Sequence, residues 1–331
     1  MKKKYSVVGI GNAIVDILGN VTEKTLEDLG IGKGVMQLID IQRSKSLLNN
    51  LQNIKQTSGG SAANTIAGLS QLGLSTAYIG KVKDDNLGKV FVKDLEKIGT
   101  VFRTPFADGS VNHETGRCIV MITPDGERSM NTYLGATEFL TANDIDPELI
   151  SSSQYVYLEG YRFDGPDSVK AFEKAVQIAN TNGVSVALTL SDPFCVARHS
   201  VAFKSLIKES VDILFCNEEE LKMLHGSNDL NQALFQISKD VEILACTLAE
   251  KGSYVCFNGD TTLIPTEKKE LVDSTGAGDL FAAGFLYGLC TERDTNNAAR
   301  LGNVAAGEII SHVGPRSEVD LLELFRNEKL I

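Results

Sequence analysis

A loop of small residues closed by a single acid lies at 272–279, where the chain reads VDSTGAGD. The apolar segment LFAAGFLYGL follows at once, so a helix is expected to begin in this loop. The backbone N–H groups of Gly276, Ala277 and Gly278 would then form an anion site, because a helix N-terminus attracts phosphate. Asp279 beside that site suits a base that takes a proton from an attacking hydroxyl. This combination predicts phosphoryl transfer to an alcohol, and a simple helix cap is the structural alternative.

A second glycine-rich segment, SGGSAANT at 58–65, precedes another helix-compatible stretch, IAGLSQLGL. Gly59 and Gly60 carry no Cβ, so the backbone can approach a ligand closely there. Asn64 lies one turn into the expected helix, and its amide can both donate to and accept from a hydroxyl. We interpret the segment as part of a substrate site. The alternative is a glycine turn before an alanine-rich core helix.

Asp16 is an acid within an apolar strand-like run, NAIVDIL, on the same face as Ile14 and Leu18. An unpaired carboxylate among apolar neighbours is costly, so Asp16 needs a partner. Two vicinal hydroxyls of a ligand would each donate one hydrogen bond to it. A structural salt bridge is the alternative.

The acidic run NEEE, at 217–220, follows directly after the expected strand DILFC. Asn217 and Glu220 are three residues apart, which places both side chains on one face of a first helical turn. Hard oxygen donors of this kind hold Mg²⁺, often through water, beside nucleotide phosphates. An acidic helix N-terminus stabilised by the helix dipole is the alternative.

The order of secondary structure predicts an α/β fold with a mainly parallel sheet, since β-branched runs alternate with helical stretches along one domain at 1–331. The expected strands are 5–11, 76–82, 155–160, 185–190, 212–217 and 243–249. The expected helices are 61–73, 86–98, 167–182, 201–210, 217–225, 229–238, 277–290, 294–312 and 318–326. The segments at about 13–40 and 103–135 have strand-like alternation without a helix, and they predict a small projecting sheet. Ligands bind outside the carboxyl ends of parallel strands, so this small sheet would act as a lid.

Composition limits the classes of function. The formal net charge of −11 argues against nucleic acid or an anionic membrane as a partner. Six cysteines are scattered without a CxxC pair, which favours reduced thiols and a cytoplasmic location. The apolar run near the N-terminus is interpreted as a first strand rather than an export signal. The chain lacks a GxxxxGK[ST] loop, and Gly9-x-Gly11 is not followed by the third glycine of a dinucleotide site.

The two glycine motifs, in this order and about 200 residues apart, resemble those of the ribokinase-like (PfkB) carbohydrate and nucleoside kinases. The stretches that look most like the adenosine kinase branch lie at 115–137, 157–168, 192–199, 211–221 and 301–316. The resemblance implies a three-layer α/β/α sandwich with a β lid, the use of ATP and Mg²⁺, and a monomer or a homodimer formed through the lid. By the same resemblance Asp16 grips a sugar diol.

Nucleotide-binding residues are also implied by the resemblance. Thr247 and Gly252 match a nucleotide loop of the family, in which Ala249 stands where the family has its first glycine. Asn303 matches a position near the adenine of ATP, and Arg128 matches an arginine that reaches the phosphates when the lid closes.

Acceptor-binding residues carry over in the same way. Gln37, Leu38, Tyr161 and Arg162 fall where adenosine kinases contact the base. The region of Asp273 and Gly314 corresponds to a monovalent cation site in some relatives, so K⁺ is a possible further cofactor.

The function expected from these observations is ATP-dependent phosphorylation of the 5′-hydroxymethyl group of a purine ribonucleoside, adenosine to AMP, with Asp279 as base. The alternative is a sugar kinase acting on ribose, fructose or 2-keto-3-deoxygluconate. A free-sugar pocket would be small and polar, whereas a nucleoside needs apolar walls. Met36, Tyr161 and Phe163 favour the nucleoside.

Overall fold

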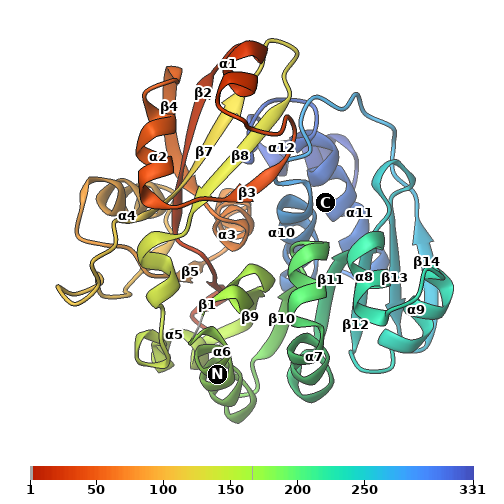
Figure 1. Cartoon of the computed structure of the whole chain (residues 1–331). Helices are drawn as coiled ribbons and strands as arrows, with labels where there is room; N and C mark the ends of the chain where they lie inside the picture. The colour runs from red at the N-terminus through yellow and green to blue at the C-terminus, as the bar shows by residue number, and fades with distance from the viewer. Residues whose placement is uncertain (1–2, 166) are drawn as a thin grey trace.

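A mainly parallel sheet runs through the larger part of the molecule (Figure 1). The computed structural model describes residues 3–165 and 167–331, and within them this sheet has nine strands. Neighbouring strands are parallel except at one edge, where the last two strands are antiparallel. Across the sheet the strands are β14 (Asp260–Ile264), β13 (Ser253–Phe257), β12 (Ile243–Thr247), β11 (Ile213–Asn217), β10 (Ser185–Thr189), β9 (Ser153–Glu159), β1 (Tyr5–Ile10), β5 (Thr76–Ile79) and β6 (Val101–Phe102).

Helices cover both faces of this sheet, because successive strand side chains point to opposite faces and both sets are apolar. In β1, for example, Val8 and Ile10 pack into one core, and Val7 packs into the other. The helices of the first core are α5 (Pro147–Ser151), α6 (Ser168–Thr181), α7 (Pro193–Ser210), α8 (Glu218–His225) and α9 (Leu230–Ile237). Those of the second core are α3 (Ser61–Gln71), α4 (Asn86–Lys97), α10 (Ala277–Cys290), α11 (Thr295–Ile309) and α12 (Leu321–Asn327). The predicted three-layer α/β/α sandwich is therefore confirmed.

A second, small sheet projects from the sandwich, at the top left of Figure 1. Its strands, in spatial order, are β3 (Met36–Leu38), β8 (Arg128–Tyr133), β7 (Gly116–Ile122), β2 (Ile14–Asn20) and β4 (Gln52–Gly59). One face packs on α1 (Glu23–Asp28) and α2 (Ile41–Leu48), whose Leu26 and Leu47 meet Ile119 and Met121. The other face carries Asp16, so the small sheet has one face for packing and one for a ligand.

The structure corrects the expected composition of the small sheet. The prediction that 13–40 contains no helix is wrong, since α1 begins there after Thr22, whose side chain accepts a hydrogen bond from the N–H of Thr25. The edge strand β4 lies outside both predicted segments and was not predicted. Its first five residues are exposed and mostly polar, so they show no apolar alternation.

In the main sheet, the antiparallel pair β13 and β14 was also not predicted. Helix α7 begins at Pro193, eight residues earlier than expected, because Asp192 caps it.

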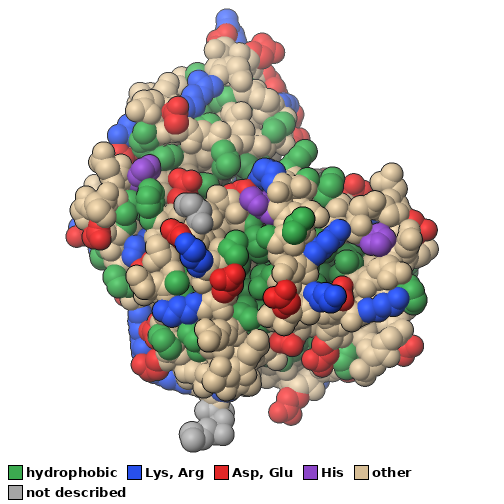
Figure 2. All heavy atoms as spheres, turned by 60° about the horizontal axis from the view of Figure 1, so that its bottom comes forward, with side chains coloured by type: hydrophobic (Ala, Val, Ile, Leu, Met, Phe, Trp, Pro, Cys, Tyr) green, Lys and Arg blue, Asp and Glu red, His purple; other side chains and the backbone are tan. Residues whose placement is uncertain are grey.

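Surface charge is mixed on the face seen in Figure 2, where lysine and arginine side chains lie among aspartates and glutamates. The six cysteines are free thiols. Within the described residues, no helix combines the length and the apolar character needed to cross a membrane.

Candidate active site

Two helix N-termini meet at the carboxyl ends of the central strands. Helix α10 starts after Gly276, whose φ of 81° is a left-handed conformation, and helix α3 starts after Gly60. The helices pack closely, since a Cβ at Gly68 would lie 2.9 Å from the Cβ of Ala283. Among the described residues, no side chain caps α10. The Ala277 N–H donates to the Ser274 carbonyl oxygen at 3.2 Å, so this N–H is not free for an anion as predicted. Gly278 faces open space, which leaves room for an anion.

Asp279 lies in the first turn of α10 and is held by two donors from α3. The Oγ of Ser61 donates to its Oδ1 at 2.6 Å, and the Nδ2 of Asn64 donates to its Oδ2 at 2.9 Å. Burial raises the pKa of Asp279, and these two hydrogen bonds partly oppose the rise. Asn64 is itself buried, and its Oδ1 has no partner within the part of the chain that the structure describes. The pair thus presents a fixed carboxylate oxygen beside a free amide oxygen that can accept from a hydroxyl. Ser61 was not predicted, because a serine before an alanine-rich helix carries no distinctive signal.

Asp16 approaches the turn between β4 and α3. A Cβ at Gly59 would collide with the Asp16 carboxyl, and a Cβ at Gly60 would collide with the carbonyl oxygen of Asn12. Gly60 also has a φ of 101°, so the turn requires glycine at both positions for steric reasons. Burial raises the pKa of Asp16 to about 7, although nearby arginines act in the opposite direction.

Arg316 is a site residue that sequence reasoning missed. Its charge opposes the rise in the pKa of both Asp16 and Asp279, and burial lowers its own pKa. Its Nη2 donates to the carbonyl oxygen and to the Oγ of Ser58, at 2.9 and 2.8 Å. An arginine after Gly-Pro reads as an exposed loop residue, so only the three-dimensional fold reveals this position.

Asn217 and Glu220 close a reciprocal capping box at the start of α8. The Asn217 Oδ1 accepts from the Glu220 N–H at 2.8 Å, and the Glu220 Oε2 accepts from the Asn217 N–H at 2.9 Å. Burial raises the pKa of Glu220 to about 7, and the charges of Asp192 and Asp279 raise it further. The Asn217 Nδ2 also donates to the Glu220 Oε1 at 2.8 Å, so the two side chains are paired with each other as the helix cap that the sequence offered as the alternative.

The predicted nucleotide loop contains an alanine in the left-handed region. Ala249 has a φ of 51°, so it keeps the left-handed conformation that glycine favours. A Cβ at Gly252 would collide with the carbonyl oxygen of Ile264, and Gly252 has a φ of 95°. Thr247, at the end of β12, donates its hydroxyl to the Cys216 carbonyl at 3.4 Å.

Asn303 is buried in α11 and contacts the same end of β14 that packs on Gly252. Its Nδ2 donates to the carbonyl oxygen of Ile264 at 3.0 Å. Asn303 therefore holds the end of β14 that also packs on Gly252.

The face of the small sheet that carries Asp16 is largely apolar, and Thr132 and Arg128 are polar residues on the same face. Asp16 pairs with Cys118, Cys118 with Thr132, and Thr132 with Leu38, so these four side chains form one cross-strand row on one face. The apolar residues of the same face form a cluster that consists of Ile14, Cys118, Val120, Leu18, Ile122 and Met130.

Gln37 lies on the opposite face, which corrects its expected role as a base contact. It is the register neighbour of Asn131, and its Nε2 donates to the Oδ1 of Asn131 at 2.6 Å. Alternation along β3 instead places Met36 and Leu38 on the face of Asp16.

Arg162 is also misplaced as a base contact, because its side chain is fully buried. Its Nη1 donates to the Oδ1 of Asn12 at 3.1 Å and to the carbonyl oxygen of Thr137 at 2.6 Å, and its Nη2 donates to the Oγ of Ser168 at 2.6 Å. Phe163, expected near the base, stacks on core residues instead, with its ring centre 4.1 Å from that of Phe203.

Tyr161 is half-buried and packs against the first core. Burial raises its pKa, and the charges of Asp192, Glu220 and Asp279 raise it further, so its hydroxyl lies within their field. The contact of Tyr161 with a base stays a prediction.

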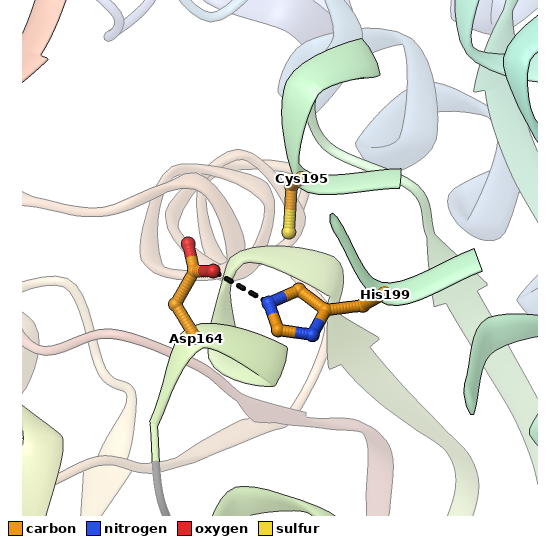
Figure 3. Close-up of side chains that lie close together, drawn as sticks. All are labelled: Asp164, Cys195 and His199. Atoms are coloured by element: carbon orange, nitrogen blue, oxygen red, sulfur yellow. Dashed lines mark hydrogen bonds and ion pairs between the residues drawn. The ribbon is translucent and has the colours of Figure 1, made fainter. Parts of the chain in front are cut away.

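A side-chain network fixes the 3-10 helix Gly160–Asp164 on α7. Figure 3 shows the Asp164 carboxylate and the His199 imidazole turned toward each other, 2.7 Å apart, with the Cys195 thiol nearby. The three residues offer ligand atoms within 4.8 Å of one another. However, Arg198 already binds both carboxylate oxygens, at 3.1 and 2.7 Å, and burial raises the pKa of Cys195 to about 12. We therefore interpret the cluster as a closed network that holds the segment of Tyr161.

Arg128 is buried at the start of β8, and its Nη1 contacts the Asp273 Oδ2 at 2.8 Å. The carboxylate expected near a monovalent cation is thus paired with a guanidinium. The Nε and Nη2 of Arg128 have no partner among the described residues.

The chain is similar to known proteins over most of its length. Residues 30–321 match the model of the pfkB family of carbohydrate kinases. An adenosine kinase from Sinorhizobium meliloti has a solved structure with 41% identity and a TM-score of 0.91, covering 98% of this chain and 99% of that chain. A probable sugar kinase from Rhizobium etli CFN 42 has 37% identity and a TM-score of 0.92, covering 99% and 100%. A 5-dehydro-2-deoxygluconokinase from Bacillus licheniformis is 28% identical over 300 residues, which is 87% of this chain and 91% of that protein.

Proposed function

Because the chain belongs to the pfkB family of carbohydrate kinases, we propose that it transfers the terminal phosphoryl group of ATP to the 5′-hydroxyl of a purine ribonucleoside, with adenosine as the preferred acceptor. Family membership supports the kinase reaction and the use of ATP with Mg²⁺. The choice of acceptor rests on the site and on the similarity to the Sinorhizobium meliloti enzyme.

The observation that carries the proposal is the cross-strand row from Asp16 to Leu38. The Asp16 carboxylate lies at one end of the row. Cys118, Thr132 and Leu38 follow it across the sheet, beside the partly exposed apolar residues around Met130. Three strand spacings separate the ends of the row, about 14 Å. Asp16 suits the two ribose hydroxyls, and the apolar face suits a planar base, whereas a monosaccharide has no apolar part of that length.

The reaction follows from the position of Asp279. A nucleoside whose diol is held by Asp16 would extend its CH₂OH toward α10, where Asp279 accepts the hydroxyl proton as the oxygen attacks phosphorus. Ser61 and Asn64 keep the carboxylate oriented for that transfer. The N–H groups of Gly278 and Asp279, in the first turn of α10 beyond the bonded Ala277, would stabilise charge on the transferred phosphoryl oxygens. Bound Mg²⁺, held near Glu220, would neutralise the polyphosphate.

A sugar kinase is the second candidate, because the Bacillus licheniformis relative is named for a sugar acid. An acidic sugar needs a cation for its carboxylate. Arg128 offers unpartnered Nε and Nη2 groups, and its charge acts on Asp16. The two candidates therefore share Asp16 and Asp279 but differ in whether the apolar face or Arg128 meets the acceptor.

The test compares adenosine with 5′-deoxyadenosine, which has the same base and diol but lacks the attacked hydroxyl. Calorimetry should give similar dissociation constants for both compounds, while ADP release from MgATP should occur only with adenosine. Phosphorus NMR should identify the product as a 5′-monophosphate. The proposal fails if neither compound binds, or if 5′-deoxyadenosine is phosphorylated as fast as adenosine.

A further inference from the structure

Asp273, at the start of the anion loop, joins three segments that are far apart in the sequence. Its Oδ1 accepts from the N–H of Thr275 at 3.0 Å, within the loop itself. Its Oδ2 accepts from the N–H of Gly314 at 3.0 Å and from the Nη1 of Arg128 at 2.8 Å. The side chains of Asp273 and Arg128 are only 5% and 4% exposed. A buried ion pair thus ties strand β8 of the small sheet to the loop that precedes Asp279.

A second tie joins the same region to β4, at the opposite edge of the small sheet. Arg316 donates to the backbone and to the side chain of Ser58. Between Arg316 and Gly314, Pro315 packs on the cap of α10, since a Cβ at Gly276 would lie 2.9 Å from the Pro315 Cα. The segment 314–316 is therefore held directly by β4 and, through Asp273, by Arg128 of β8, and it packs against the cap of α10.

We propose that Arg128 and Asp273 are a positioning pair that couples docking of the small sheet to the geometry of the anion loop. If the small sheet moves, the loop at Asp273 must move with it, because otherwise the buried Arg128 and Asp273 would lose each other as partners, which is strongly unfavourable. Arg128 depends on Asp273 in this respect, because its Nε and Nη2 have no other partner among the described residues.

The pair has a functional consequence that depends on the kinase reaction but not on the identity of the acceptor. The acceptor binds to the small sheet at Asp16, and the nucleotide phosphates bind to the first turn of α10. If the ion pair links these elements, each ligand increases the affinity for the other by the same factor.

The test measures this factor as the ratio of the MgADP dissociation constants without and with saturating adenosine, by calorimetry. Wild type is expected to give a ratio of about 5 or more. Arg128→Met, Asp273→Asn and the double variant should each give a ratio near 1. The matched control is Lys33→Gln, which removes exposed ion pairs from the same small sheet and should keep the wild-type ratio.

The double variant separates positioning from mere stability. It contains no stranded charge, so its melting temperature should exceed that of Arg128→Met, yet its ratio should remain near 1. The proposal is overturned if the folded double variant keeps the wild-type ratio, or if wild type shows no coupling. A loss of MgADP affinity in Arg128→Met with the ratio intact would instead indicate direct phosphate contact. If wild type binds no adenosine, the substrate proposal fails, and the same ratio is measured with 2-keto-3-deoxygluconate.

Discussion

Replacing Asp279 by asparagine removes the proposed base while keeping the shape of the side chain. The Oγ of Ser61 can still donate to the Oδ1 at this position. The new amide nitrogen would face the Nδ2 of Asn64, but Asn64 can rotate its amide and present its unpartnered Oδ1 instead. Both contacts survive as neutral hydrogen bonds, so the free energy of unfolding should stay within about 1 kcal/mol of wild type.

The loss of the base should nevertheless reduce kcat by about 10² to 10⁴, which corresponds to about 3 to 5 kcal/mol of activation free energy. The assay is ADP release from MgATP and adenosine, together with the dissociation constant of adenosine and the melting temperature. Ser61→Ala is the control, since it weakens the orientation of the carboxylate but keeps the base, and it should cost less activity. A folded Asp279→Asn protein with kcat within tenfold of wild type would refute the assignment.

Three further predictions concern ionisation, strain and burial. Because the pKa of Asp16 is raised to about 7, the acceptor dissociation constant should increase about tenfold per pH unit below that value, and Asp16→Asn should bind weakly with no such pH dependence. The same shift predicts that Asp16 contributes most to the free energy of unfolding below its unfolded pKa, and that this contribution is lost as pH rises through about 7. Urea titrations of wild type and Asp16→Asn at several pH values would measure the difference. Ala249→Gly should raise the free energy of unfolding by up to about 1 kcal/mol, because it relieves a left-handed alanine, and a lower melting temperature would contradict this. Arg162→Met should lower the free energy of unfolding by about 3 to 5 kcal/mol, because it removes a buried charge that holds three segments together. A loss of acceptor affinity without a loss of stability would contradict this and would indicate that Arg162 contacts the ligand.

The sequence allowed the central part of the site to be predicted because its residues lie at strand ends and helix starts. Asp279, Asn64, Gly59 and Gly60 belong to two local motifs, and both motifs lead into helices that begin at the same edge of the sheet. In such a fold, the order of elements along the chain determines which loops meet. The contact between Asn64 and Asp279 follows from that order.

Residues whose role depends on register or on distant partners were not predictable. Gln37 lies in a strand of three residues, too short for alternation to reveal its face, and only its pairing with Asn131 places it away from Asp16. Arg162 follows a strand and resembles an exposed loop arginine. Its burial depends on acceptors at Asn12, Thr137 and Ser168, which lie far apart or give no local signal.

The measurement that tests the central claim most directly is a comparison of kcat/KM, from ADP release with MgATP, for adenosine, ribose, fructose, 2-keto-3-deoxygluconate and 5-dehydro-2-deoxygluconate. Asp279→Asn serves as the blank. A site that joins the Asp16 carboxylate to an apolar face predicts that adenosine has the highest kcat/KM, by about 10² or more over each sugar. Turnover of a sugar acid without turnover of adenosine would contradict the account. That result would indicate that Arg128, and not the apolar face, recognises the acceptor.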